Sequence, residues 1–226
     1  MGEYDGHRER LRRHYLDHGM DALRDYEVLE LILFYAIPRK DTQPAARKLL
    51  SHFGSISAVL EANLDELKAV GGLSENAALL LRMIPALSRR YLVSRSEMGV
   101  VLNNTKATGK FVVPYFHGET EEMVYLLCLD LKQKLIACRL LQKGNINTVS
   151  LPIRKAVEIA LHTNAAAVIL AHNHPGGVAL PSNADYEATK QLSDALDPLG
   201  IPLLDHVIVA DEDYVSLRDN GFIRSP

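Results

Sequence analysis

The hydrophobic period of this chain changes once, near residue 100, and that change limits the folds open to it. From residue 7 to about residue 95, apolar residues recur with the spacing of amphipathic helices. Beyond residue 121 the apolar runs are short and rich in branched and aromatic residues, which is typical of strands. A chain of 226 residues is long enough for two separate cores. We therefore predict an all-helical domain over residues 1–95, a linker over 96–104 and a second domain over 105–226.

Six helical stretches are expected in the first domain, and turn-forming residues separate them. Gly19 and Gly54 follow helical runs, and Pro38 ends the apolar stretch before it. Polar turn formers break the period over residues 96–110, which favours a linker or connecting loop there. The predicted helices cover 7–19, 21–37, 42–54, 55–62, 63–70 and 74–92.

The second domain is predicted to be α/β with a mixed sheet. Pro152 lies in a favourable first-turn position of one helix, and Pro198 and Gly200 close another. The order strand, strand, helix, strand, helix, strand indicates a sheet with helices packed on it. The predicted strands are 122–130, 134–144, 166–172 and 203–211, and the helices are 152–164 and 182–200.

Composition and charge narrow the cellular setting. The formal net charge is −3, so the molecule as a whole offers no basic footprint for nucleic acid, and any DNA contact must be regional. No apolar run reaches the length of about 18 residues that a membrane span needs, and no secretion signal is recognisable. We expect a cytoplasmic protein without membrane contact, with Cys128 and Cys138 as reduced, buried thiols of no assigned function.

The stretch AHNHPGGVALPSNAD, residues 171–185, carries the strongest chemical signal. His172 and His174 fall at the carboxyl end of a predicted strand, where open sheets present ligands. Side chains two residues apart on an extended chain point the same way, so both imidazoles can reach one ion. Pro175 restricts His174 to extended conformations, which fixes that geometry.

Ser182 and Asp185 have the S-x-x-D spacing of a helix N-cap with an acidic third residue. A capped first turn would hold Asp185 facing back toward the histidines, so capping and metal ligation are compatible. Two neutral imidazoles and one carboxylate leave a tetrahedral zinc ion one open position, as in catalytic sites. We predict one zinc ion per chain, bound by His172, His174 and Asp185, that lowers the pKa of a water molecule to about 7.

These residues also carry a family resemblance. H-N-H-P followed by P-S-N-A-D resembles the JAMM motif of MPN-type metallopeptidases, and its setting, with LLDHVIV after it, is similar to bacterial RadC proteins from about residue 105 onward. The resemblance implies an MPN (JAB/JAMM)-like α/β domain with zinc on His172, His174 and Asp185, and Ser182 near a developing oxyanion. It also implies a glutamate on an early strand as general base.

The stretch GETEEMVYLLCLD offers three glutamates for that base: Glu119, Glu121 and Glu122. We choose Glu122, because it comes directly before the apolar strand, where RadC-like sequences carry a glutamate. Alternation also places it on one face with Val124 and Leu126. Asp205 and His206 recur in RadC-like chains as well, but a core role is favoured for His206 and neither residue enters the predicted catalytic set.

The helical half resembles the helix-hairpin-helix region of RadC proteins less closely. That element brings backbone N–H groups of a glycine turn close to DNA phosphates, whereas this chain has Gly72, Leu73 and Ser74, so its second glycine is replaced. The basic cluster HRERLRRH could contact phosphates, although such runs are usually solvated helix faces. Weak DNA binding through this domain is the expectation.

Two classes of function follow. The first is a zinc-dependent metallopeptidase or isopeptidase in which the glutamate activates a water molecule and peptide or isopeptide bonds are the substrates. A metal-dependent nuclease is a variant of it, with one metal and no second carboxylate cluster arguing against the usual two-metal nucleases. The alternative is a DNA-binding, DNA-repair-associated protein whose metal site is structural or vestigial. The sequence leaves the substrate and the oligomeric state open.

Overall fold

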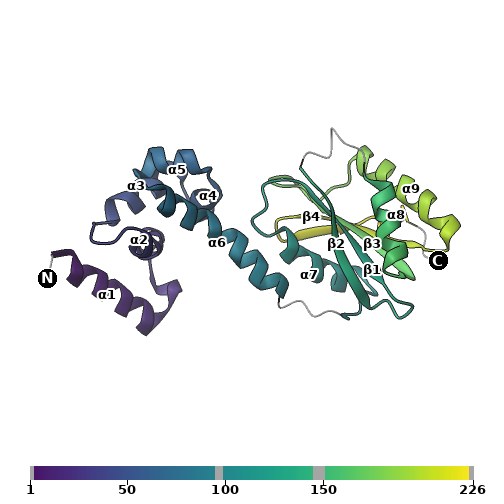
Figure 1. The fold of residues 1–226 in the computed structure, drawn as a ribbon, viewed down its shortest axis with the longest axis horizontal. Coiled ribbons are helices and arrows are strands. Elements are labelled where there is room, and N and C mark those ends of the chain that lie inside the picture. Colours follow the sequence, from purple (N-terminus) through teal and green to yellow (C-terminus); the bar gives the residue numbers. More distant parts are fainter. Residues whose placement is uncertain (1–2, 95–98, 145–150, 224–226) are drawn as a thin grey trace. The chain divides into compact units, whose positions relative to one another are not determined.

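The structure of the chain is a computed structural model that describes residues 3–94, 99–144 and 151–223. The fold divides into two compact units, Met1–Leu87 and Ser88–Pro226, and the division falls inside one helix. Figure 1 shows a unit made of helices and a unit built on a sheet, as the sequence predicted. Residues 96–98 of the predicted linker lie outside the described residues. In the described part of the chain, no helix has the length and apolar character needed to cross a membrane.

The first unit is built from helices of 3 to 20 residues. Their apolar faces form a core around Leu33, Leu49 and Leu81, none of which is exposed. The elements are α1 (Glu3–His18), a 3-10 turn (Met20–Ala22), α2 (Asp25–Ala36), α3 (Gln43–Phe53), α4 (Ile56–Glu61), α5 (Leu64–Gly71) and α6 (Glu75–Ser94), of which α6 continues into the second unit.

Short polar side chains start the small helices of this unit. The Ser55 side chain accepts a hydrogen bond from the Ala58 N–H, and the Asn63 side chain accepts one from the Glu66 N–H. Gly54 ends α3 with φ +84°, a left-handed conformation that L side chains rarely adopt. These caps explain why predicted and observed helices agree closely here.

The second unit is a five-stranded mixed sheet in the order β2-β1-β3-β4-β5. Only β3 and β4 run parallel among the described strand pairs, and α9 makes the crossover between them. The strands are β1 (Met123–Leu129), β2 (Leu135–Lys143), β3 (Ala167–Asn173), β4 (Leu203–Ala210) and β5 (Asp213–Ser216).

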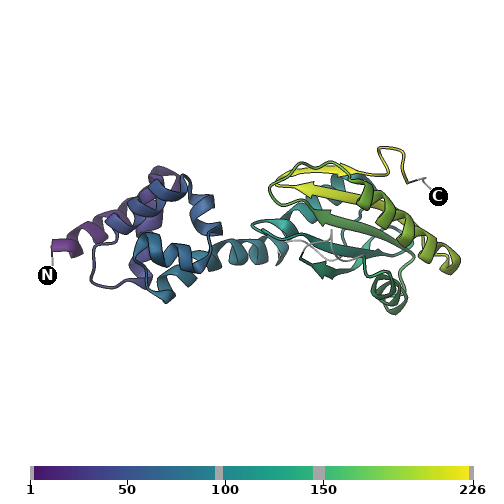
Figure 2. The ribbon, with the colours of Figure 1, turned by 90° about the horizontal axis from the view of Figure 1, so that it is seen from above.

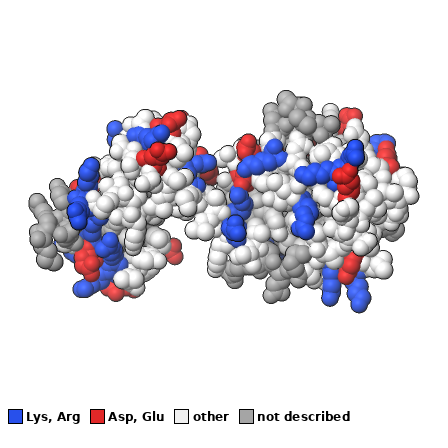
Figure 3. All heavy atoms as spheres, in the orientation of Figure 1, with Lys and Arg blue, Asp and Glu red and all other residues white. Residues whose placement is uncertain are grey.

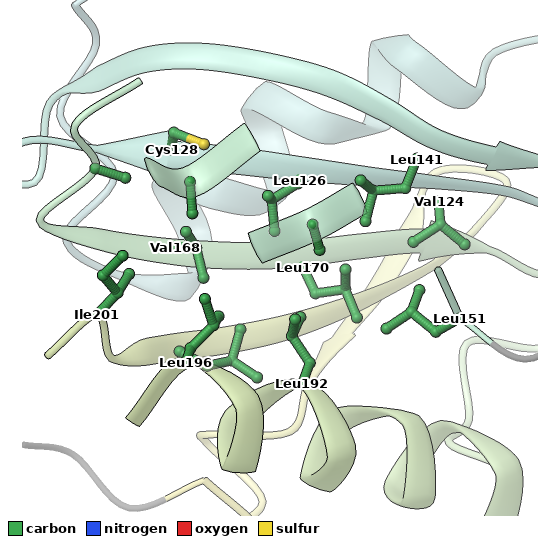
Figure 4. Packing of buried hydrophobic residues seen from close by; sticks show 14 of the residues in the cluster. Val124, Leu126, Cys128, Leu141, Leu151, Val168, Leu170, Leu192, Leu196 and Ile201 are labelled. Carbon is green, nitrogen blue, oxygen red and sulfur yellow. The ribbon is translucent and has the colours of Figure 1, made fainter. Parts of the chain in front are cut away.

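Helices cover both faces of the sheet. On one face, α8 (Ile153–His162) and α9 (Asn183–Leu196) pack over side chains of β1 and β3, as the labels Leu126, Leu170 and Leu192 show in Figure 4. On the other face, α7 (Thr105–Phe116) packs against the alternate side chains of the same strands. Figure 2 shows the sheet between these helices. Alternation therefore decides which side chains of β3 face α9.

Two elements were not predicted from the sequence. Helix α7 includes residues 105–110, for which polar turn formers in the sequence predict a linker or connecting loop. Gly109, two valines and Pro114 also make it a weak helix by propensity. It is held by an Asn104 cap and by close packing, since a Cβ at Gly109 would lie 2.4 Å from the Tyr214 ring. Strand β5 is a four-residue edge strand beyond the last predicted strand, which ends at residue 211.

The two cysteines are free thiols in neighbouring strands; Cys128 is buried, as predicted, whereas Cys138 is only partly buried. Burial raises the pKa of Cys138 to about 12 and also raises that of Cys128, so both stay protonated at neutral pH. Thiols in that state are poor nucleophiles and poor metal ligands. This agrees with their having been assigned no function.

Candidate metal centre

His172 and His174 lie at the carboxyl end of β3, where the strand leaves the sheet. His172 pairs with Val124 of β1 and Ile208 of β4 and is only 2% exposed. The His174 N–H donates to the Val209 carbonyl at 2.8 Å, which keeps the chain extended past the last residue of β3. Because Val124 belongs to the core beneath α8 and α9, its partner His172 faces α9, and His174 follows on that face.

Asp185 reaches the histidines from the first turn of α9. Ser182 and Asp185 form a capping box, in which the Ser182 N–H donates to Asp185 Oδ2 at 2.7 Å and the Asp185 N–H donates to Ser182 Oγ at 3.2 Å. Asp185 Oδ1 is 3.0 Å from His172 Nε2, and Oδ2 is 3.5 Å from His174 Nε2. One carboxylate therefore caps the helix and faces both imidazoles, as the sequence indicated.

The hydrogen bond on the far side of the His174 ring sets its tautomer. His174 Nδ1 is 3.1 Å from the Val178 carbonyl oxygen, which can only accept. Nδ1 must therefore carry a proton. In the neutral His174 ring, Nε2 then has a free lone pair, which points toward Asp185 and His172. The two histidine Nε2 atoms are 2.9 Å apart.

Three electron-pair donors thus converge at one point. One ligand atom from each of His172, His174 and Asp185 lies within 4.8 Å of the others. Burial alone would raise the pKa of Asp185, but the polar contacts with His172 and His174 outweigh burial and hold that pKa well below its usual range. The hydrogen bond with Asp185 raises the pKa of His174 despite partial burial.

This donor set fits a metal ion. Two imidazole nitrogens with their far nitrogens occupied by other partners, plus one carboxylate, are the ligands of many single-metal centres. Of the described residues, His172, His174 and Asp185 form the group of histidine, cysteine and acidic side chains that could hold an ion. They are the three residues that the sequence motif predicted as ligands.

Glu122 lies just before β1 on the side of the cluster. Continuing the antiparallel register that pairs Val124 with His172 by two residues on each chain segment brings Glu122 opposite His174 and on the same face. The charge of Glu122 also contributes to the raised pKa of His174, after the larger effect of Asp185. Its side chain is half-buried. Its role as general base stays a prediction.

The other two candidate glutamates are engaged in ion pairs. Glu119 is 6% exposed at its side chain and contacts Arg89 and Lys143. Glu121 is 57% exposed and lies 3.3 Å from Lys143 Nζ. Both carboxylates therefore have cationic partners away from the histidines, which supports the choice of Glu122.

Asn173 was missed by sequence reasoning, although it positions the segment that carries Glu122. Asn173 lies between the two histidines in the sequence, and its side chain points to the opposite face. There its Oδ1 accepts a hydrogen bond from the Met123 N–H at 2.7 Å. Its Nδ2 donates to the Glu121 carbonyl at 3.1 Å. The central residue of H-N-H thus ties the start of β1 to the end of β3.

Ser182 is exposed, and its hydroxyl donates to Asp185 Oδ2 at 2.7 Å. That bond orients the carboxylate and uses the single hydroxyl proton. The role predicted for Ser182 beside an oxyanion stays a prediction, because it requires this proton to turn from the carboxylate to a substrate oxygen.

His206 and Asp205 lie side by side on β4 but point to opposite faces. His206 is buried, as predicted, and it also contacts the cluster, with Nε2 2.7 Å from His172 Nδ1. Asp205 accepts hydrogen bonds from the Ser216 hydroxyl and the Arg218 N–H, at 2.7 and 3.1 Å. It therefore ties β4 to β5 and the chain beyond, away from the histidines.

We expect Asp205→Ala to lower the free energy of unfolding by about 2–4 kcal/mol, because the buried Ser216 hydroxyl and two N–H groups lose a charged acceptor. Urea unfolding followed by circular dichroism measures the change. Glu187→Ala on the exposed side of α9 is the matched control and should change stability by less than about 0.5 kcal/mol. Equal stability of the two variants would contradict the structural role of Asp205.

Fold and cluster together define a class of protein. A helix-covered mixed sheet, with paired histidines at a strand end and a carboxylate at the start of the next helix, is compatible with JAMM-type metal-dependent hydrolases. The sequence matches the family described as RadC-like JAB domain over residues 102–222. This match spans more than half of the chain, so the chain belongs to that family. The resemblance seen in the H-x-H-P and S-x-x-D motifs is thereby confirmed.

Proposed function

We propose that this protein is a zinc-dependent hydrolase of amide bonds, with peptide or isopeptide substrates. The observation that carries the proposal is the convergence of two Nε2 lone pairs and one carboxylate at the end of β3. His172, His174 and Asp185 would hold the ion, and three protein ligands leave zinc a position for a reactant. When bound, zinc supplies Lewis-acid activation of a water molecule and of the substrate carbonyl.

Glu122 is assigned the proton transfers. Its carboxylate accepts the proton of the attacking water and returns it to the nitrogen of the leaving amine, so the residue is restored at the end of each turnover. Its place opposite His174 supports this assignment, because the water must lie between the ligands and the base. Ser182 donates its hydroxyl proton toward the oxygen on which negative charge develops.

A groove beside the cluster favours a peptide over a nucleic acid. It encloses about 360 Å³ and is lined by Gly177–Ala179, by Ala210 and Asp211 at the end of β4, and by Asp213–Val215 of β5. Val178 both lines this groove and holds His174 through its carbonyl. Asp211 and Asp213 give the groove negative charge, which repels a phosphodiester backbone and accepts an uncharged or basic peptide. This argues against the nuclease variant.

The decisive experiment loads the purified chain with zinc and offers it two substrate sets. We expect cleavage of a library of quenched peptides and isopeptide conjugates, and no cleavage of single-stranded, duplex or branched DNA. Asp185→Asn, which keeps the shape of the side chain and removes its charge, serves as the inactive control. DNA cleavage that disappears in Asp185→Asn would replace the proposal with a nuclease. Failure to take up stoichiometric zinc would remove the hydrolase altogether.

DNA binding by the helical unit is expected to be weak, because much of its basic cluster is used internally. Arg8 donates to the Ile37 and Lys40 carbonyls, and the Arg12 guanidinium lies 5.7 Å from the Tyr35 ring centre. On the face shown in Figure 3, the Lys and Arg side chains of this unit lie among Asp and Glu side chains.

We therefore expect binding to branched or single-stranded DNA that is lost near physiological salt. The logarithm of affinity should fall with the logarithm of salt with a slope of about −0.9 per phosphate contact. Fluorescence anisotropy at several salt concentrations measures this slope. Tight binding that persists at high salt would contradict the expectation and favour a DNA-binding role.

A further inference from the structure

Behind the metal-facing side of His172 lies a continuous chain of buried hydrogen bonds. His172 Nδ1 is 2.7 Å from His206 Nε2, and His206 Nδ1 is 2.6 Å from Thr189 Oγ1. Thr189 Oγ1 is in turn 2.5 Å from the backbone carbonyl oxygen of Asp185. His172, His206 and Thr189 are at most 2% exposed. This series of hydrogen bonds joins two of the three candidate ligands, His172 and Asp185, on the side away from their metal-facing atoms.

The position of each proton follows from the Asp185 end of this chain. A carbonyl oxygen cannot donate, and two oxygens 2.5 Å apart require a hydrogen between them, so the Thr189 hydroxyl donates to Asp185. A hydroxyl has one proton. Thr189 Oγ1 is therefore an acceptor toward His206, and His206 Nδ1 must carry the proton that it donates.

The second half of the chain completes the assignment. The hydrogen-bond partners of the His206 ring among the described residues are the Thr189 hydroxyl and the His172 imidazole. Because the ring is buried and neither contact is with a carboxylate, a second proton on His206 would be a buried charge without a paired anion. The neutral ring has a lone pair at Nε2, which accepts from His172 Nδ1–H. His172 then keeps its own lone pair at Nε2, the atom that faces Asp185 and His174.

We propose that Thr189 and His206 are positioning residues that fix the tautomer of His172 and so direct its Nε2 lone pair into the metal centre. An imidazole can donate or accept at either nitrogen, so His206 alone would leave the direction open; the Thr189 hydroxyl decides it. His174 needs no such chain, because a backbone carbonyl already accepts from its Nδ1. The inference rests on the proposed metal centre but not on hydrolysis.

The first test is the tautomer of His172 in the metal-free protein, read at a pH of about 8 by long-range nitrogen–proton correlation of imidazole-labelled protein. In the natural protein we expect Nδ1–H rings at both His172 and His206. In Thr189→Val, His206 loses its acceptor and is expected to place its proton on Nε2 instead. His172 then becomes an acceptor at Nδ1 and carries its proton on Nε2. A His172 ring that stays in the Nδ1–H form in this variant overturns the proposal.

The second test is zinc affinity, measured by competition with a chelator. Thr189→Val should weaken it about 10–100-fold, as residues that orient metal ligands typically do. Thr189→Ser retains the hydroxyl and should keep most of the affinity, although, unlike the isosteric Thr189→Val, it loses a buried methyl group. His206→Phe should lower zinc affinity as much as Thr189→Val does. In His206→Gln the amide oxygen can accept a hydrogen bond from His172, so this variant should recover part of the lost affinity.

Folding and metal binding are kept apart by the design. Melting temperatures of all variants are recorded. Thr189→Ser removes a buried methyl group and Thr189→Val does not, so zinc affinity that falls in Thr189→Ser as much as in Thr189→Val would indicate a packing effect and overturn the proposal. If the natural protein binds no zinc, the proposed function fails, and the tautomer comparison in the metal-free protein still decides this inference.

Discussion

Glu122→Gln is expected to retain zinc and to lose about 10²–10⁴-fold in turnover. The amide keeps the size of the side chain and can still hydrogen-bond to water, but it cannot accept the proton of the attacking water. The loss should fall on kcat, because the carboxylate acts in the transition state rather than in binding the substrate. Steady-state kinetics on a cleaved peptide and the zinc content of the same sample measure the two effects together.

Glu121→Gln is the matched control for that experiment. Glu121 is the residue next to Glu122; it is exposed, and its ion pair with Lys143 lies outside the histidine cluster. The turnover of the Glu121→Gln variant should therefore stay close to that of the natural protein. Full activity of Glu122→Gln beside an inactive Glu121→Gln or Glu119→Gln would show that the base was misassigned. Activity in all three variants would reject a glutamate-based mechanism.

Alanine at His172, His174 or Asp185 is expected to weaken zinc binding more than about 100-fold, beyond the effect of residues that only support ligands. Each variant leaves two protein ligands, fewer than such centres use. Bound zinc after dialysis against a mild chelator measures the loss. Asp185→Ala should also destabilise α9 by about 0.5–1 kcal/mol, because an anion leaves its first turn.

His162→Ala controls for the loss of a histidine in general, since His162 is exposed at the end of α8 and should leave zinc content unchanged. Any one of the three variants that retains stoichiometric zinc removes its residue from the set of ligands.

The fold was predictable where local signals and burial agree. Hydrophobic period, Ser55, Asn63 and Gly54 all indicate the same helices, and the central strands β1, β3 and β4 are buried on both faces. Helix α7 could not be predicted, because its stability comes from packing of Gly109 against Tyr214, which lies more than 100 residues further along the chain. Tertiary contacts override weak propensity there.

The site shows the same division between local and distant information. His172, His174, Ser182 and Asp185 could be grouped from one short stretch, because strand alternation and a capping box are local geometry. Asn173 and the groove depend on which strands become neighbours. The roles of Thr189 and His206 depend further on the direction of each hydrogen bond, which no spacing in the sequence encodes.

The crossover β3–α9–β4 contains the three candidate ligands and both residues proposed to orient them, all between residues 167 and 210. Glu122 comes directly before a different strand, β1, whose start is held to this segment by Asn173. Under the proposed mechanism, metal retention and catalysis are encoded in separate stretches of the gene. A descendant that lost Glu122 would then stop turning over substrate while its metal content, and every motif around the histidines, stayed as it was. Zinc in such a relative would be evidence for the crossover alone, and the residue before β1 would distinguish an enzyme from a binding protein.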